Sequence, residues 1–94
     1  MLAEKDRKAF VNFYDTVRDE SVFDRKTTIL IGLAASLSGG CEPCVEHYLR
    51  VAEENKISQE EIGAVQGICM AAAAGKINSL MRLVEQKRQE VEVD

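Results

Sequence analysis

The spacing of apolar and charged positions along the chain predicts helices joined by short turns. In residues 3–19 charges separate apolar residues that share one helical face: Ala3, Phe10, Val11, Phe13, Tyr14 and Val17. A second helix is expected to start near Arg25, with Asp24 as its N-cap, and to stop at Gly39-Gly40. Its middle, residues 29–37, is apolar on nearly all sides. The alanines and the length of this segment favour a buried helix over a strand.

The next helix is expected to begin at a pair of cysteines and to run to about Glu54, with Asn55 as a left-handed cap. Ser58-Gln59-Glu60-Glu61 then has the form of a capping box, in which the Ser58 hydroxyl accepts from the Glu61 amide and Glu61 reaches back. A fourth helix follows, and its apolar residues share one face: Ile62, Val65, Ile68, Cys69, Ala72 and Ala73.

A fifth helix is predicted beyond Gly75, which is expected to end the fourth one. Its apolar positions are Ile77, Leu80, Met81 and Val84. The chain from Val91 onward is expected to fray. Met70, Met81 and the alanine-rich stretches are interpreted as core or subunit contacts, not as a cofactor site.

This organisation predicts an all-α fold of about five helices in a single domain over residues 1–94. The chain contains only one proline and six glycines, and alternating strand patterns are scarce. A domain of this length buries only about 60–65% of the surface that its unfolded chain exposes. The modest core and the apolar segment 29–37 therefore predict association with further copies of the chain.

The charge of the chain limits the classes of partner that it can bind. The net charge is -4 and the isoelectric point is about 5.0, with basic residues scattered and acidic ones densest at 90–94, which argues against nucleic acid. The N-terminal MLAEKDRKAF is charged and lacks the apolar core of a signal peptide. The longest apolar run, residues 29–37, is shorter than the roughly 20 residues that span a bilayer. We therefore expect a cytoplasmic protein without a membrane partner.

Cys41 and Cys44 form the clearest chemical motif. On a helix they lie about 60° apart, so their side chains can meet. Gly39 and Gly40 give the approach conformational freedom, and Pro43 suits a first helical turn. In a cytoplasmic protein such a pair indicates redox chemistry or metal binding instead of a disulfide framework.

The environment of the pair contains opposing influences on the thiols. A helix N-terminus favours the thiolate, which is the attacking species in peroxide reduction and disulfide exchange. The neighbouring carboxylates of Glu42 and Glu46 disfavour it. The sequence does not decide between these two effects.

Two other interpretations of the pair remain open. Cys41 and Cys44 can be inert core thiols, or they can bind zinc with His47 and, at most, Cys69 as further ligands. The lack of a second C-x-x-C weakens the zinc interpretation, and Cys69 is more simply a small buried apolar residue. We favour a redox pair and expect neither a metal nor a cofactor.

The order of the motifs resembles the alkyl hydroperoxidase D and carboxymuconolactone decarboxylase family. Asp24-Arg25-Lys26-Thr27, an apolar helix, Gly40-Cys41-Glu42-Pro43-Cys44-Val45-Glu46-His47 and the capped helix after Ser58 carry this resemblance, over about residues 20–75. It implies an all-helical subunit that forms trimers or hexamers.

The resemblance also implies chemistry. In the hydroperoxidase branch the two cysteines, matched here by Cys41 and Cys44, reduce peroxides with the help of one Glu and one or two His, and a dithiol partner such as a lipoyl protein re-reduces them. The decarboxylase branch acts on a lactone carboxylate and does not depend on the pair.

The expected acid and base partners are absent from their usual places. The relay Glu position holds Ile29, the relay His position holds Tyr48, and the place of a second histidine holds Pro43. His47 is the obvious substitute, and it lies about 60° from Cys44 but about 120° from Cys41 on a helix. A solvent-facing or interface role for His47 remains an alternative. For Tyr48, packing is favoured over hydrogen bonding to the pair.

The leading hypothesis is a thiol-dependent peroxidase with Cys41, Cys44 and His47 as catalytic residues, a hydroperoxide as substrate and a dithiol protein as possible reductant. The position of His47 slightly favours Cys44 as the attacking thiol. One alternative is a family member without peroxidase activity that acts as a structural or binding subunit. Another is a decarboxylase-type enzyme.

Overall fold

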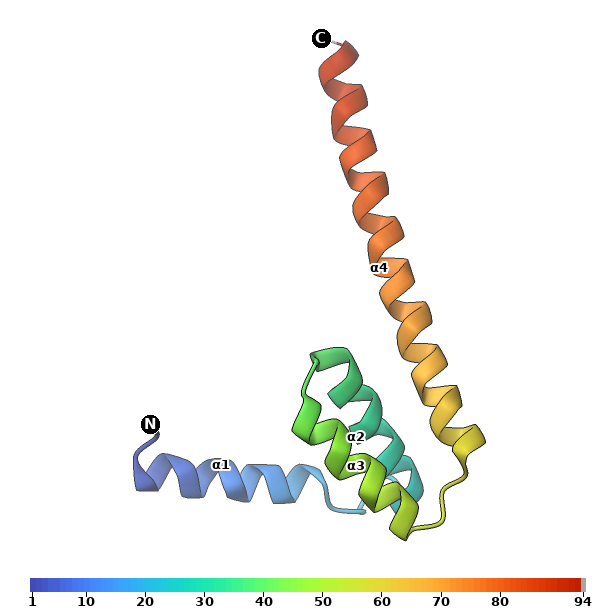
Figure 1. Ribbon diagram of the computed structural model, residues 1–94. Coiled ribbons are helices and arrows are strands. Elements are labelled where there is room, and N and C mark those ends of the chain that lie inside the picture. The colour runs from blue at the N-terminus through green and yellow to red at the C-terminus, as the bar shows by residue number, and fades with distance from the viewer. Residues whose placement is uncertain (94) are drawn as a thin grey trace.

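The computed structural model describes residues 1–93, and that range contains four helices and no strand. They are α1 (Glu4–Val17), α2 (Arg25–Gly39), α3 (Glu42–Glu54) and α4 (Gln59–Val93). Figure 1 shows α2 and α3 as a central antiparallel hairpin, α1 leaving it to one side, and α4 running beside the hairpin and then projecting away. The expected all-α class is confirmed, whereas the expected number of five helices is wrong.

The missing boundary is the one predicted at Gly75. Helix α4 continues through this glycine to Val93, so the predicted end at Gly75 is wrong. The predicted fraying from Val91 stays a prediction, and its last residue lies outside the described range. A glycine retains its backbone N–H and costs a helix only about 0.5–1 kcal/mol relative to alanine. It ends a helix when the backbone turns left-handed, and among the described glycines only Gly40 has a positive φ.

Gly40 ends α2 as predicted. Its φ is 69°, its N–H donates to the Leu37 carbonyl at 3.3 Å, and the N–H of Cys41 donates to the Ser36 carbonyl at 3.0 Å. These two bonds form a Schellman motif, which satisfies carbonyls at the end of the helix. The motif also fixes the direction in which the chain enters α3, where Cys41 is the N-cap.

The end of α3 differs from the prediction by one residue. Asn55 has a φ of -98°, and the left-handed residue is Lys56, with a φ of 58°. The N–H of Ile57 donates to the Ala52 carbonyl at 3.0 Å, and both residues are buried in one cluster. This contact sets the register of the cap, because a Schellman motif pairs apolar residues before and after the turn.

The predicted N-caps of α2 and α4 are present. The Asp24 carboxylate accepts from the Thr27 N–H at 2.7 Å, and the Ser58 hydroxyl accepts from the Glu61 N–H at 3.1 Å. The Glu61 carboxylate accepts from the Ser58 hydroxyl at 2.9 Å and also forms an ion pair with Lys26, which ties the start of α4 to α2.

The core of the chain is small and centres on α2, which packs against both α3 and α4. Its buried residues are Ile29, Leu33, Ser36, Ala52 and Ile57. The Ser36 hydroxyl is satisfied because it donates to the Gly32 carbonyl at 2.7 Å. The apolar segment 29–37 is therefore buried on one side only, since Ile31 is 48% exposed.

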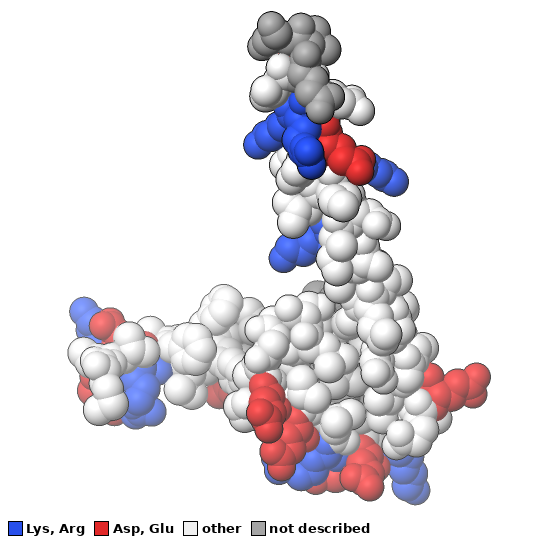
Figure 2. Space-filling view, turned by 45° about the horizontal axis from the view of Figure 1, so that its top comes forward, with Lys and Arg blue, Asp and Glu red and all other residues white. Residues whose placement is uncertain are grey.

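The two outer helices leave large apolar surfaces uncovered. Helix α1 buries none of its residues, and every described residue of α4 from Met70 onward is exposed. In Figure 2 charged side chains gather at the free end of α1, at the foot of the hairpin and on the outer part of α4, and the surface between them carries few charges. None of the helices in residues 1–93 combines the length and apolar character needed to cross a bilayer.

Candidate active site

Cys41 and Cys44 are joined by a disulfide at the start of α3. Their Cα atoms are 5.2 Å apart, and both residues are half-buried. The Cys41 carbonyl accepts from the Val45 N–H at 3.0 Å, which is the first hydrogen bond of the helix, and Pro43 occupies the first turn, where its missing N–H costs nothing. The expectation that the two side chains can meet is confirmed.

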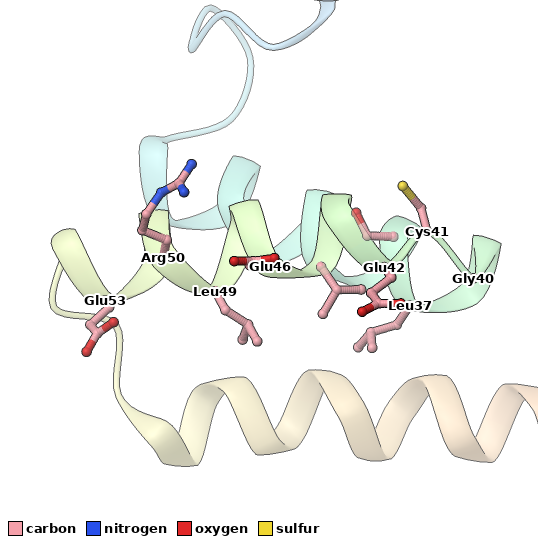
Figure 3. A pocket seen from close by; sticks show the side chains of 10 residues that line it. Leu37, Gly40, Cys41, Glu42, Glu46, Leu49, Arg50 and Glu53 are labelled. Atoms are coloured by element: carbon pink, nitrogen blue, oxygen red, sulfur yellow. The ribbon is translucent and has the colours of Figure 1, made fainter.

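A shallow groove of about 660 Å³ runs along α3 beside Cys41. Its lining includes the apolar side chains of Leu37, Val45 and Leu49 and the carboxylates of Glu42, Glu46 and Glu53. In Figure 3 the side chains of Leu37 and Leu49 point to the side on which α4 lies, whereas the sulfur of Cys41 and the guanidinium of Arg50 point the opposite way. The sulfur is therefore directed away from these two leucines.

His47 follows Cys44 by one helical turn and is half-buried. Its Nε2 lies 3.3 Å from Nη2 of Arg18, and its Nδ1 lies 3.4 Å from Nη2 of Arg50. Its ring also meets Tyr48 edge to face, with centroids 5.1 Å apart. Both ring nitrogens therefore contact arginines, and the solvent-facing or interface role stays an alternative. Its role in catalysis stays a prediction.

The two arginines were not among the predicted site residues. Arg50 lies three positions after His47 on the same helix, so helical spacing alone can identify it. Arg18, the C-cap of α1, comes from 29 positions earlier, and no local pattern marks it. Its guanidinium lies over the Tyr14 ring at 4.3 Å and over the Tyr48 ring at 5.7 Å, which holds it beside α3.

The two usual relay positions are part of the core. Ile29 is 5% exposed, and Tyr48 packs against the cluster of Ile29, Ala52 and Ile57. The Tyr48 ring also lies so close to Gly32 that a Cβ atom at that position would overlap it. The packing interpretation of Tyr48 is confirmed, and position 29 offers no proton donor or acceptor on its side chain.

Cys69 lies apart from the pair, in contact with α2. It is half-buried on α4, and its thiol donates to the Ala34 carbonyl at 3.6 Å. Within the described residues no three or more His, Cys, Asp or Glu side chains gather in an arrangement that can hold a metal ion. Cys69 therefore does not join Cys41, Cys44 and His47 in one cluster.

Comparison with known proteins adds a family and a fold. The family model described as the carboxymuconolactone decarboxylase family matches residues 7–86, most of the chain. A crystal structure of a protein from Methanobacterium thermoautotrophicum is similar, with a TM-score of 0.79 and 22% sequence identity, over 85% of this chain and 90% of that one. This second likeness shows the fold alone. No curated protein matches the chain.

Proposed function

This chain belongs to the carboxymuconolactone decarboxylase family, and we propose that it is a thiol peroxidase. The observation that carries the proposal is the Cys41–Cys44 disulfide at the start of α3, with His47 one turn beyond it. A pair that closes within one helical turn can pass between dithiol and disulfide without refolding of the helix.

The proposed reaction has two steps. The Cys44 thiolate attacks the distal oxygen of a hydroperoxide, the O–O bond breaks, and protonation of the departing alkoxide gives an alcohol and a sulfenic acid on Cys44. The Cys41 thiol then attacks that sulfur, and the disulfide forms with release of water. An external dithiol reduces the disulfide and returns two protons and two electrons to the pair.

Cys44 is proposed as the attacking thiol because His47 follows it by one helical turn. It lies in the first turn of α3, where unpaired amides and the helix dipole favour a thiolate. His47 lies one turn further on, beside the guanidiniums of Arg18 and Arg50. Positive charge favours a thiolate, whereas the carboxylates of Glu42 and Glu46 disfavour one.

Trapping of sulfenic acid with dimedone tests this assignment. After one equivalent of cumene hydroperoxide we expect the Cys41→Ser variant to accumulate a dimedone adduct on Cys44 and the Cys44→Ser variant to form none. Cys69→Ser is the matched control and is expected to form the disulfide like the native chain. An adduct in Cys44→Ser but not in Cys41→Ser would reverse the two roles.

The physiological assembly proposed here is a homo-oligomer, a trimer or a hexamer, that a dithiol protein re-reduces. The uncovered apolar faces of α1 and α4 support self-association.

One observation favours a second candidate function, a structural or binding subunit without peroxidase activity. Ile29 and Tyr48 occupy the two relay positions and serve the core. Consumption of cumene hydroperoxide with dithiothreitol as reductant separates the two, because only the peroxidase loses its turnover in Cys44→Ser.

A further inference from the structure

Three side chains that carry hydrogen-bond donors converge on the face of α3 beyond the cysteine pair. His47 lies between Arg18 and Arg50, with its two ring nitrogens 3.3 Å and 3.4 Å from the respective Nη2 atoms. A guanidinium can only donate, and a neutral imidazole has a single accepting nitrogen. In either tautomer, therefore, one of the two arginines faces an N–H group instead of an acceptor.

No carboxylate within residues 1–91 lies at ion-pairing distance from Arg18, His47 or Arg50. The ion pairs among residues 1–91 join other cations, namely Arg7 and Lys8 to Glu4, Arg25 to Glu20, and Lys26 to Glu61. Acidic residues nevertheless outnumber basic ones, 16 to 12. The two arginines that contact His47 thus have no ion-pair partner among these residues, and both can donate to a ligand. Carboxylates do line the same cavities: Asp15, Asp19 and Glu20 with Arg18, and Glu46 and Glu53 with Arg50.

An apolar cavity opens directly beside this cluster. It measures about 670 Å³, a volume within the roughly 300–1,000 Å³ range of small-molecule sites, and Arg18 and Tyr48 both line it. Its lining comes from the end of α1, the turn after it and α2. The apolar lining residues are Val17, Val22, Phe23, Ile31 and Ala35, and the polar ones besides Arg18 and Tyr48 are Thr16, Asp19, Ser21 and Thr28. A ligand that fits both parts has a charged acceptor group at one end and an apolar body.

We propose that Arg18, Arg50 and His47 bind the carboxylate of an amphipathic organic acid whose apolar tail lies in this cavity. A carboxylate has about four lone-pair sites, enough to accept from both guanidiniums, and arginine binds it with two parallel hydrogen bonds. The carboxylate thus supplies the acceptor that His47 cannot offer to the second arginine. On the proposed peroxidase function, the preferred substrates are hydroperoxides of fatty-acid type, with a carboxylate distant from the O–O bond.

Binding is tested without turnover, on the disulfide form of the full chain, by NMR titration with octanoate. Because the chain contains one histidine, the imidazole C–H signals report on His47 alone. We expect octanoate to shift these signals saturably and methyl octanoate to leave them unchanged. Arg50→Gln and Arg18→Lys are each expected to lower the affinity for octanoate by about tenfold, because a lost charge-assisted hydrogen bond costs of order 1.4 kcal/mol.

Arg82→Gln is the matched control, because Arg82 is an exposed cation on the projecting part of α4. It is expected to bind octanoate like the native chain. Arg18→Lys keeps the positive charge beside Tyr14, whereas the planar, forked geometry of the guanidinium is lost. The carboxylate site would be overturned if octanoate caused no saturable shift. It would also be overturned if Arg82→Gln lost as much octanoate affinity as Arg18→Lys and Arg50→Gln.

A kinetic comparison separates this inference from the proposed function. Linoleic acid hydroperoxide is expected to exceed its methyl ester in kcat/KM, and Arg50→Gln is expected to reduce that preference by about tenfold. Octanoate binding with no turnover of either hydroperoxide would contradict the peroxidase and leave the carboxylate site standing. Equal turnover of acid and ester without octanoate binding would contradict the site and leave the peroxidase standing.

Discussion

Gly40 shows how one residue sets the position of the cysteine pair. Its left-handed backbone (φ 69°) is unfavourable for any residue with a Cβ, at roughly 1–2 kcal/mol. We expect Gly40→Ala to lower the free energy of unfolding by about that amount. Gly39→Ala is the control, because Gly39 is helical with nothing within 4 Å of an added Cβ, and it should stabilise by about 0.5–1 kcal/mol. Urea unfolding at one protein concentration measures both, and equal effects would contradict this account of the turn.

Gly32 and Tyr48 form a second pair whose fit can be tested. A Cβ at position 32 would overlap the Tyr48 ring, so Gly32→Ala is expected to destabilise the chain by about 1–3 kcal/mol. Truncation of the ring in Tyr48→Val removes the obstacle. The double variant should therefore be less destabilised than the sum of the two single variants, as a double-mutant cycle of thermal unfolding will show. Strict additivity would contradict a direct contact.

The site residues differ in how far the sequence could predict them. Cys41, Cys44 and His47 share one helical segment, so their spacing alone indicated that they lie close together. Arg50 belongs to the same helix and could have been found in that way. Arg18 lies beyond two turns of the chain, and its contact with His47 depends on the path of residues 18–24, which periodicity does not describe.

At the scale of the element, the start of α4 depends on the ionisation of Glu61. Hydrogen bonds from Lys26 and Ser58 lower the pKa of this carboxyl below its ordinary value of about 4.5. A lowered folded-state pKa contributes stability that is present above the ordinary value and is lost as the pH falls through the folded-state value. We therefore expect the urea concentration at the unfolding midpoint of the native chain to decrease as the pH is lowered below about 4.5.

Glu61→Gln isolates this contribution. It should lower the midpoint at pH 7 and leave a smaller decrease below pH 4.5, because the remaining lowered carboxyl pKa values, such as that of Asp24, still contribute. Glu60→Gln is the matched control, since Glu60 is the exposed neighbour and forms no ion pair among the described residues. The same pH profile in Glu61→Gln and the native chain would contradict the role of Glu61.

Helix ends were predictable where a side chain or a backbone conformation demands the end. Asp24, Gly40 and Ser58 were identified because each satisfies groups that a helix terminus leaves unpaired. The helix end predicted at Gly75 was wrong because a glycine is also tolerated inside a helix. The left-handed residue after α3 was misplaced because the burial of Ile57, a tertiary contact, decides its register.

At the scale of the molecule, the single chain is far from compact. Its radius of gyration is 19.0 Å, whereas a compact domain of this length has about 12 Å. Helical periodicity was enough to predict the all-α class and the apolar faces of the helices. It could not predict that α1 and α4 leave those faces uncovered, because a pattern of apolar residues does not say which chain covers them.

The proposed oligomer follows from these faces. Sedimentation at micromolar concentration is expected to show an assembly, and Leu80→Glu, which adds a charge to an exposed apolar position of α4, should weaken it by at least about tenfold. Gln86→Glu adds the same charge at an exposed polar position of α4 and should leave the assembly intact. A stable, folded monomer of the native chain at this concentration would contradict the proposal.

The central claim is that Cys41 and Cys44 cycle as a peroxide-reducing pair, and a thiol count tests it most directly. The reduced, metal-free chain is exposed briefly to cumene hydroperoxide, and its thiols are counted before and after, with the mass of the product. We predict rapid loss of two of the three thiols and an internal Cys41–Cys44 disulfide. Loss no faster than that of free cysteine would contradict the claim and favour the subunit without peroxidase activity.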